Sequence, residues 1–407
     1  MNNCEPQGGA APDQLAHLVS GRQKAALVAK LVRKDKNKQA SKILFSNGAA
    51  PRDSAAPPRL KKMYHTPPNP LTPHQQSVKK IKVKASQTEK IMRAKAGNKE
   101  SPVDVFGWSA CMFTDDRGRK RSNGRLTLLQ QAARFTAMYA SADLPPAIAF
   151  LGNCCQLTEL NKINELEQQA RIDLGLDRKT RCISAGSELT KVAMAAAKNS
   201  PQVAAFTRTL QPIQTACGTK NGPSIMAYTV AALHKSAHNV ILDDRKDAFP
   251  SLNRQAILDE VERHIPAATS LTNLSYVLPS PVFFLIREKG KWIAHILWSE
   301  EGLRQGSVWG NLLYCTTIKS KLDTLANKFP NVVIKAQVDD ITKSFGPPHD
   351  GNWHNHWLMI REFLELEDEL FTQIGQHRHP DKCYLVLAPG APNPGSLFDI
   401  NGIKRKV

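Results

Sequence analysis

The chain has 407 residues, 41% of them hydrophobic, and is therefore long enough to bury a sizeable core in one or two domains. No stretch approaches the roughly 20 consecutive apolar residues of a membrane span, and the N-terminus lacks the apolar core of a secretory signal, so we expect a soluble intracellular protein, nuclear or cytoplasmic. The eight cysteines are scattered without a C-x-x-C pair, which predicts reduced thiols instead of a disulfide framework or a zinc ribbon.

The first 100 residues carry most of the net charge of +19. They contain 20 Lys and Arg against six Asp and Glu, a balance of +14 that leaves +5 for the other 307 residues. Because 1–100 is also proline-rich and poor in aromatic residues, we expect it to be mostly disordered. Two stretches, 14–34 and 77–97, could form helices, either solvated ones or ones that order on a polyanion. The region is expected either to solubilise the chain or to contact nucleic-acid phosphates.

Residues 101–237 are globular in composition and predicted to be mainly helical. Helical periodicity runs through 125–141, 157–172, 187–200 and 222–236, and Ser187 is placed to cap the third of these helices.

Residues 238–407 mix strands and helices. The predicted strands lie at 238–243, in "SPVFFLIREKG" and "KWIAHILWSE", at 331–338 and in "KCYLVLAP", and the predicted helices lie at 251–263 with a Ser251 cap, at 310–327 and at 355–373. Some strands follow one another through short turns and others through helices. The pattern therefore predicts an α+β fold whose sheet is antiparallel in part and carries helices on one face.

Two of the predicted strands end in adjacent acids. "VILDDRKDAF" (240–249) contains Asp243 and Asp244, and "AQVDDITKSF" (336–345) contains Asp339 and Asp340. Unpartnered carboxylates about 4 Å apart repel by roughly 4 kcal/mol at an effective dielectric near 20, so such acids lie in water or meet a cation. Neighbouring strands would bring both pairs to one sheet edge. Oxygen-only ligands there favour Mg²⁺, and two such ions suit phosphoryl transfer.

Four segments in order resemble the palm motifs of reverse transcriptases. "LDDRKDAFPSLNRQAILDEV" resembles the first motif, "EEGLRQGSVWGNLLYCTTIKSKL" the second, "AQVDDITKSF" the third and "GQHRHPDKCYLVLAP" the fourth. Upstream, "RCISAGSELTKVAMAAAK" resembles the family's fingers segment. The spacing is most similar to that of reverse transcriptases of non-long-terminal-repeat (LINE-like) retrotransposons, over roughly residues 145–400.

The resemblance implies a role for each matching residue. The implied catalytic residues are Asp244, Asp339, Asp340 and Lys382, and the implied nucleotide-binding residues are Arg181, Phe249, Gln305 and Gly306. The three aspartates would bind two Mg²⁺ ions, with Asp340 contributing less directly, and the spacing to Phe249 favours Asp244 over Asp243. Phe249 would exclude a sugar 2′-hydroxyl, and Lys382 would protonate the leaving pyrophosphate.

Each of these residues also has an ordinary structural alternative. The acids are solvated strand ends in that interpretation, Phe249 is a core residue, and Gln305 and Gly306 form the turn before a helix. Arg181 then makes a surface ion pair, and Lys382 is an exposed strand lysine.

The resemblance further implies right-hand polymerase fingers in 101–237 and a palm with a ferredoxin-like antiparallel sheet in 238–407. The thumb is expected to be absent, because the sequence ends soon after the fourth motif. The implied partners are an RNA template, a DNA primer and deoxynucleoside triphosphates.

Two alternative functions stay open. A viral-type RNA-directed RNA polymerase shares the palm acids, although the aromatic Phe249 disfavours it. A non-catalytic nucleic-acid-binding remnant is favoured by the expected lack of a thumb and by Ser307 and Val308, which depart from the family pattern after the Gln-Gly turn.

Overall fold

The computed structural model describes residues 60, 69–74, 80–96, 104, 112, 127–288, 291–395 and 403–406. The helix expected at 14–34 lies outside these residues, as does most of 1–100, for which disorder is predicted. Within 77–97 the chain forms α5 (Ala85–Ala96), which confirms the helix expected there. No helix in the described part of the chain is long and apolar enough to cross a membrane.

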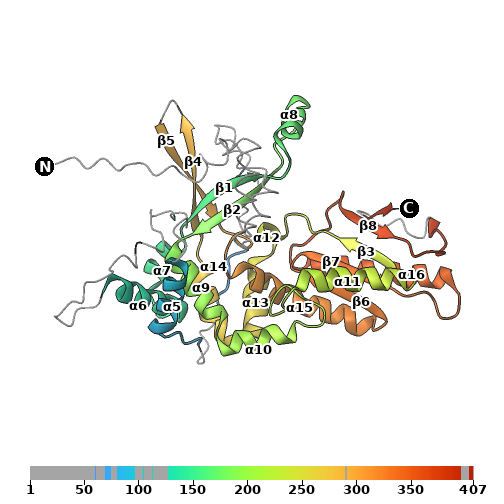
Figure 1. Ribbon diagram of the computed structural model, residues 1–407, viewed down its shortest axis with the longest axis horizontal. Coiled ribbons are helices and arrows are strands. Elements are labelled where there is room, and N and C mark those ends of the chain that lie inside the picture. Colours follow the sequence, from blue (N-terminus) through green and yellow to red (C-terminus); the bar gives the residue numbers. More distant parts are fainter. Residues whose placement is uncertain are drawn as a thin grey trace, which may run out of the picture.

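The described chain is a mixed α/β structure (Figure 1). After α5 its helices are α6 (Leu128–Ala140), α7 (Pro146–Gly152), α8 (Glu165–Asp173), α9 (Glu188–Lys198), α10 (Pro201–Thr209), α11 (Gly222–Lys235), α12 (Ala248–Ser251), α13 (Arg254–His264), the 3-10 helix η2 (Pro266–Ala268), α14 (Thr269–Tyr276), α15 (Gly310–Lys328) and α16 (Trp353–Thr372). Its strands are β1 (Cys155–Asn161), β2 (Thr180–Gly186), β3 (Asn239–Asp243), β4 (Ser280–Glu288), β5 (Lys291–Ser299), β6 (Val332–Gln337), β7 (Asp340–Phe345), β8 (Cys383–Val386) and β9 (Ile403–Lys406).

The strands form two separate sheets. The four-stranded sheet has the order β2-β1-β4-β5, in which β1 and β4 pair in parallel and the other neighbours are antiparallel. The five-stranded sheet has the order β6-β7-β3-β8-β9, in which only β8 and β9 are parallel. A sheet that is antiparallel in part is therefore confirmed. The four-stranded sheet takes strands from both sides of the domain boundary predicted between residues 237 and 238.

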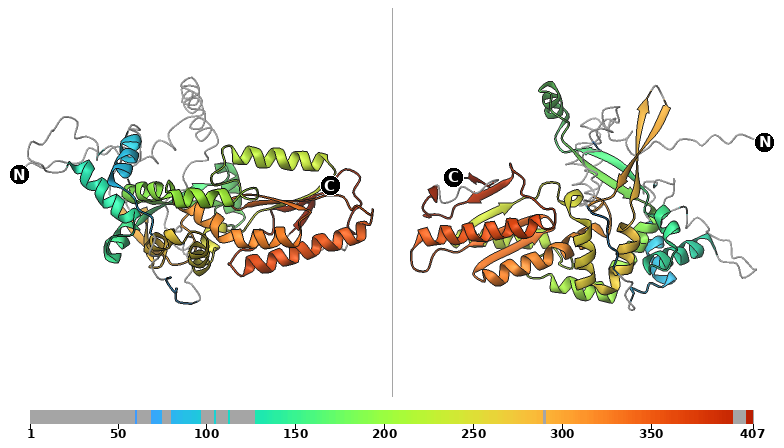
Figure 2. Two further views of the ribbon diagram at one scale, coloured as in Figure 1. Left: turned by 90° about the horizontal axis from the view of Figure 1, so that it is seen from below. Right: turned by 180° about the vertical axis from the view of Figure 1, so that it is seen from behind.

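Helices lie on both faces of the five-stranded sheet, which corrects the prediction of helices on one face (Figure 2). Ile241, Ile341 and Leu385 are buried and belong to the main core, together with residues of α15 and α16. Because side chains alternate along a strand, Val240 and Leu242 point to the other face, where they line a pocket with α11.

Three sequence predictions about individual elements have different outcomes. Ser187 caps α9, with its Oγ accepting from the Thr190 N–H, as expected. Helix α13 is capped by Asn253 instead of Ser251, because Ser251 is already the last residue of α12. The helix predicted at 157–172 is wrong in its first half. There β1 alternates buried side chains with partly buried or exposed ones, and α8 begins only after Asn164, which caps it.

Candidate active site

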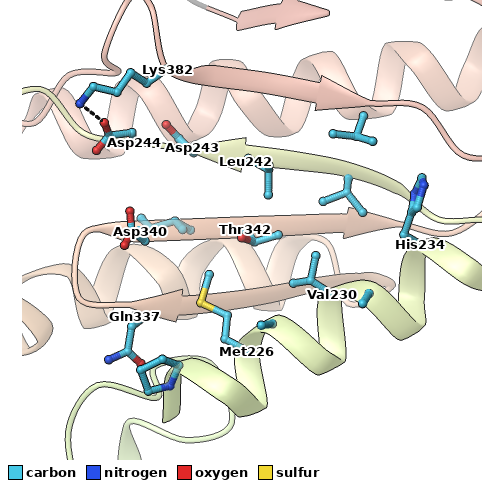
Figure 3. A pocket seen from close by; sticks show the side chains of 16 residues that line it. Met226, Val230, His234, Leu242, Asp243, Asp244, Gln337, Asp340, Thr342 and Lys382 are labelled. Carbon is cyan, nitrogen blue, oxygen red and sulfur yellow. Dashed lines mark hydrogen bonds and ion pairs between the residues drawn. The ribbon is translucent and has the colours of Figure 1, made fainter. Parts of the chain in front are cut away.

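The predicted acids meet at one end of the five-stranded sheet. Strands β3 and β7 pair with Asp243 opposite Ile341, so the next position along the strands places Asp244 opposite Asp340. Cβ atoms of residues directly opposite in antiparallel strands lie about 4.5–5.5 Å apart. Figure 3 shows Asp244 and Asp340 at the same end of these adjacent strands. Asp339 is the neighbouring residue in the turn between β6 and β7.

The turn that carries Asp339 has a strained backbone. Val338 has a φ of 63°, in the left-handed region that β-branched residues rarely adopt. Gln214 holds this residue from both sides, because its Oε1 accepts from the Val338 N–H at 2.9 Å and its Nε2 donates to the Val338 carbonyl at 3.2 Å. Strain that is held in place in this way is a feature of functional sites. The sequence analysis did not identify Gln214.

Asp243 lies on the opposite face of β3 and takes no part in the acidic group. Its carboxylate is fully buried and forms ion pairs with Arg245 and Lys343. Glu367 forms ion pairs with the same two cations, each at 2.8 Å. Although burial alone would raise the pKa of Asp243, these cations hold it well below its ordinary value. Asp244, which the spacing to Phe249 favours, therefore lies with the other acids, whereas Asp243 belongs to a buried group of ion pairs.

A pocket of about 350 Å³ lies beside the acids. Six of the eight residues predicted for the site line it, namely Arg181, Asp244, Phe249, Gln305, Asp339 and Lys382. Asp340 lies instead at the rim of a second pocket of about 600 Å³ between α11 and the sheet, which Asp244 and Lys382 also line. Asp244 and Lys382 therefore separate two neighbouring pockets.

The first pocket is also lined by cations from β1 and β2, along with Glu159 and Asp177. Lys162 follows β1, Lys179 precedes β2 and Arg181 lies near the start of β2, so the paired strands bring the three cations together. Burial and the nearby charges of Lys382 and Arg181 lower the pKa of Lys162, which indicates a concentration of positive charge. Such a group of cations suits a polyphosphate. Sequence analysis identified only Arg181, although "DRKTR" (177–181) is locally basic.

The three aspartates place negative charges close together. Burial raises the pKa of Asp339, and the carboxylates of Asp340 and Asp244 raise it further. Burial and Asp244 likewise raise the pKa of Asp340. Like charges held this close favour a bound cation, and carboxylate oxygens are the donors that Mg²⁺ prefers.

The described residues contain no group of three His, Cys, Asp or Glu side chains placed to hold a metal ion by themselves. Mg²⁺ is commonly bound by one or two carboxylates together with substrate phosphates, and the pocket is lined by both carboxylates and Lys and Arg side chains. The donor set therefore fits Mg²⁺ that arrives with a phosphate-bearing ligand.

Lys382 is paired with one of the acids. Its Nζ forms an ion pair with Asp244 Oδ2 (Figure 3). The loop before β8 is fixed next to Asp244, because the His379 N–H donates to the Asp244 carbonyl at 2.8 Å. Lys382 therefore compensates the Asp244 charge in the absence of other cations.

The Gln305-Gly306 turn lies against the edge strand β2. The Gln305 carbonyl accepts from the Ser184 N–H at 2.7 Å. Gly306 has a φ of 104°, and a Cβ there would lie 3.0 Å from the Ser184 carbonyl oxygen. Only glycine meets both conditions without strain, so this turn attaches the start of α15 closely to β2.

Replacing Asp339 with Asn should stabilise the metal-free protein. The folded chain holds the Asp339 proton more tightly than the unfolded chain does, because its pKa is raised, so its charged form at pH 7 opposes folding. For Asp339→Asn we expect a Tm higher by about 1–3 °C, corresponding to about 1 kcal/mol. Calorimetry in the presence of a chelator measures this, and the gain should disappear as the pH falls towards 4. A lower Tm at pH 7 would contradict the electrostatic account.

The sequence matches no known protein-family model. It also has no significant match among curated proteins.

Proposed function

We propose that the chain is the polymerase core of a reverse transcriptase, an RNA-directed DNA polymerase of the kind found in LINE-like retrotransposons. One observation carries this proposal. Asp244, which follows β3, and Asp339, in the β6–β7 turn, line one pocket together with Lys162, Lys179 and Arg181, and Asp340 lies next to them opposite Asp244. Carboxylates and cations that share one pocket form the arrangement that nucleotidyl transfer requires.

The cations at β1 and β2 would hold the triphosphate of the incoming nucleotide. Arg181 offers a planar guanidinium fork for two phosphate oxygens, and Lys162 and Lys179 add point charges beside it. Asp244, Asp339 and Asp340 would hold two Mg²⁺ ions, which supply charge stabilisation at the attacking and leaving oxygens when bound. Phosphate binding would draw Lys382 away from Asp244. Its ammonium group would then be able to donate a proton to the leaving pyrophosphate.

Phe249 supports deoxynucleotides as the substrates. Its ring is partly exposed in the pocket, and its carbonyl accepts from the Leu303 N–H at 2.7 Å, which fixes its backbone next to the Gln305 turn. A large ring beside the sugar leaves little room for a 2′-hydroxyl. This favours an RNA-directed DNA polymerase over the alternative, an RNA-directed RNA polymerase.

The ion pair between Lys382 and Asp244 is the observation that favours a non-catalytic nucleic-acid-binding remnant. In that alternative, Lys382 permanently occupies the carboxylate that a metal would need. A direct assay separates the two functions. The full chain, in excess over a DNA primer on an RNA template at low ionic strength, should add one deoxynucleotide when Mg²⁺ is present. Nucleic-acid binding without any incorporation would support the remnant.

Phe249→Val should change the choice of sugar. The smaller side chain opens space where the 2′-hydroxyl would lie, so ribonucleotide incorporation should increase by at least about ten-fold while deoxynucleotide incorporation changes little. Single-nucleotide incorporation with each nucleotide type measures the ratio. An unchanged ratio would place the Phe249 ring away from the sugar.

The basic N-terminal residues should supply salt-sensitive affinity for RNA and DNA. Residues 81 and 92 are buried in hydrophobic cores, so removal of all of 1–100 would damage the fold, and the deletion is better restricted to 1–59. Each phosphate contact contributes a slope of about −0.9 in log K against log salt for duplex DNA. We expect the deletion to flatten this slope in a fluorescence anisotropy titration. An unchanged slope would place the binding surface in the remaining chain.

A further inference from the structure

The ring of Phe249 rests on a second aromatic ring that the proposed function does not use. The centroids of Phe249 and Tyr314 are 5.3 Å apart, with an angle of 24° between the ring planes. Tyr314 lies on α15 and is completely buried, whereas Phe249 is partly exposed in the pocket. Tyr314 therefore lies beneath the one residue that is proposed to contact the sugar.

A buried hydrogen-bond chain fixes Tyr314. Its hydroxyl donates to Gln376 Oε1 at 2.9 Å. The Nε2 of Gln376 donates to the Ala248 carbonyl at 2.9 Å and to Ser251 Oγ at 3.0 Å. The Gln376 amide therefore connects the ring beneath Phe249 with the backbone immediately before Phe249. Because Gln376 is itself buried, loss of one partner would leave a polar atom unsatisfied.

Two glycines allow the backbone to pack closely around Phe249, Tyr314 and Gln376. Gly375 has a φ of 74°, and a Cβ there would collide with the Ser251 carbonyl oxygen, so glycine allows the loop after α16 to approach α12. One turn before Tyr314 on α15, a Cβ at Gly310 would lie 3.4 Å from Phe249 Cε1. Gly310 and Tyr314 thus pack closely against the Phe249 ring.

We propose that Tyr314 and Gln376 are positioning residues. They fix the position of the Phe249 ring in the pocket and thereby determine how strongly the site discriminates between deoxyribose and ribose. This inference rests on the proposed function. The two residues do not contact the nucleotide. They act through Phe249. If the residues packed under its ring can move, the ring can move as well and make room for a 2′-hydroxyl.

The test measures selectivity, defined as kcat/KM for a deoxynucleotide divided by kcat/KM for the matching ribonucleotide, with the full chain in single-nucleotide incorporation. Tyr314→Phe keeps the ring and removes the hydroxyl, so we expect selectivity to fall about three- to ten-fold, as for the loss of one buried hydrogen bond. Gln376→Leu should cause a similar fall. Tyr228→Phe is the matched control, because Tyr228 is 77% exposed on α11, and it should leave selectivity unchanged.

Selectivity is informative because a loss of correctly folded protein lowers both rates equally and cancels in the ratio. A double variant tests whether Tyr314 affects selectivity through Phe249. If Tyr314 acts through Phe249, then Tyr314→Phe should cause no further loss of selectivity in a protein that already carries Phe249→Val.

The outcomes separate this inference from the proposed function. If the wild-type chain selects deoxynucleotides while Tyr314→Phe and Gln376→Leu keep that selectivity within two-fold, the inference is overturned and the polymerase function stands. An additional loss in the double variant would also overturn it, because Tyr314 would then act independently of Phe249. If the wild-type chain incorporates no nucleotide, the proposed function is overturned and the inference with it.

Discussion

Asp339→Asn and Asp244→Asn should each reduce nucleotide incorporation by about 10²–10³-fold or more. Both carboxylates line the pocket that Lys162, Lys179 and Arg181 also line, and each change removes a negative charge that would compensate a metal ion beside the phosphates. Because Asn has nearly the same size and shape, the loss would report on charge and not on packing. Single-turnover incorporation on an RNA template with Mg²⁺ is the measurement.

Asp323→Asn is the matched control for this experiment. Asp323 lies on α15, where it forms an ion pair with Lys319 at 2.6 Å, and it lines neither pocket. We expect its incorporation rate to equal that of the wild type. Full activity in Asp339→Asn would show that the paired acids are solvated strand-end residues, and the polymerase proposal would fail.

Asp243→Asn should lower the free energy of unfolding by about 3–5 kcal/mol. The change leaves Arg245 and Lys343 fully buried with Glu367 as their shared carboxylate, so positive charge in the interior is no longer balanced. Removal of one partner from a buried ion pair is costly because the remaining charge stays desolvated. Urea unfolding monitored by circular dichroism measures the difference.

The pH dependence of this difference provides a second check. The pKa of Asp243 is lowered in the folded chain, so its stabilising contribution is complete above the ordinary pKa of about 4 and is lost as the pH falls below it. The gap between wild type and Asp243→Asn should therefore be constant from about pH 5 to 8 and narrow in acid. A gap of less than about 1 kcal/mol at pH 7 would show that the ion pairs contribute little.

The sequence predicted well the features that depend on local patterns. Apolar runs that end in acids identified β3 and the turn beyond β6, and the spacing to Phe249 favoured Asp244 over Asp243. Alternation along β3 explains why the structure places these two residues differently. Adjacent residues of a strand point to opposite faces, so only one of the two aspartates can lie beside Asp340 of β7.

Features that depend on distant contacts could not be predicted. The segment 157–172 has apolar spacing that fits a helix, but β1 gains its hydrogen bonds from β2 and β4, which no local pattern specifies. Gln214 holds Val338 from 124 positions away, and only the folded chain reveals it as part of the site. Lys162 and Lys179 join Arg181 for the same reason, because strand pairing brings them together.

The parallel pairing of β1 with β4 has a consequence for how the protein is made. Cys155 pairs with Val282, so β1 leaves the ribosome 127 residues before its neighbour does. At synthesis rates of about 5–20 residues per second, one edge of the nascent β1–β2 hairpin stays open for about 6–25 s. An unpaired strand edge is a template for association with other chains. Expression at high level should therefore depend on chaperones that act on the nascent chain during this interval, before β4 and β5 close the sheet.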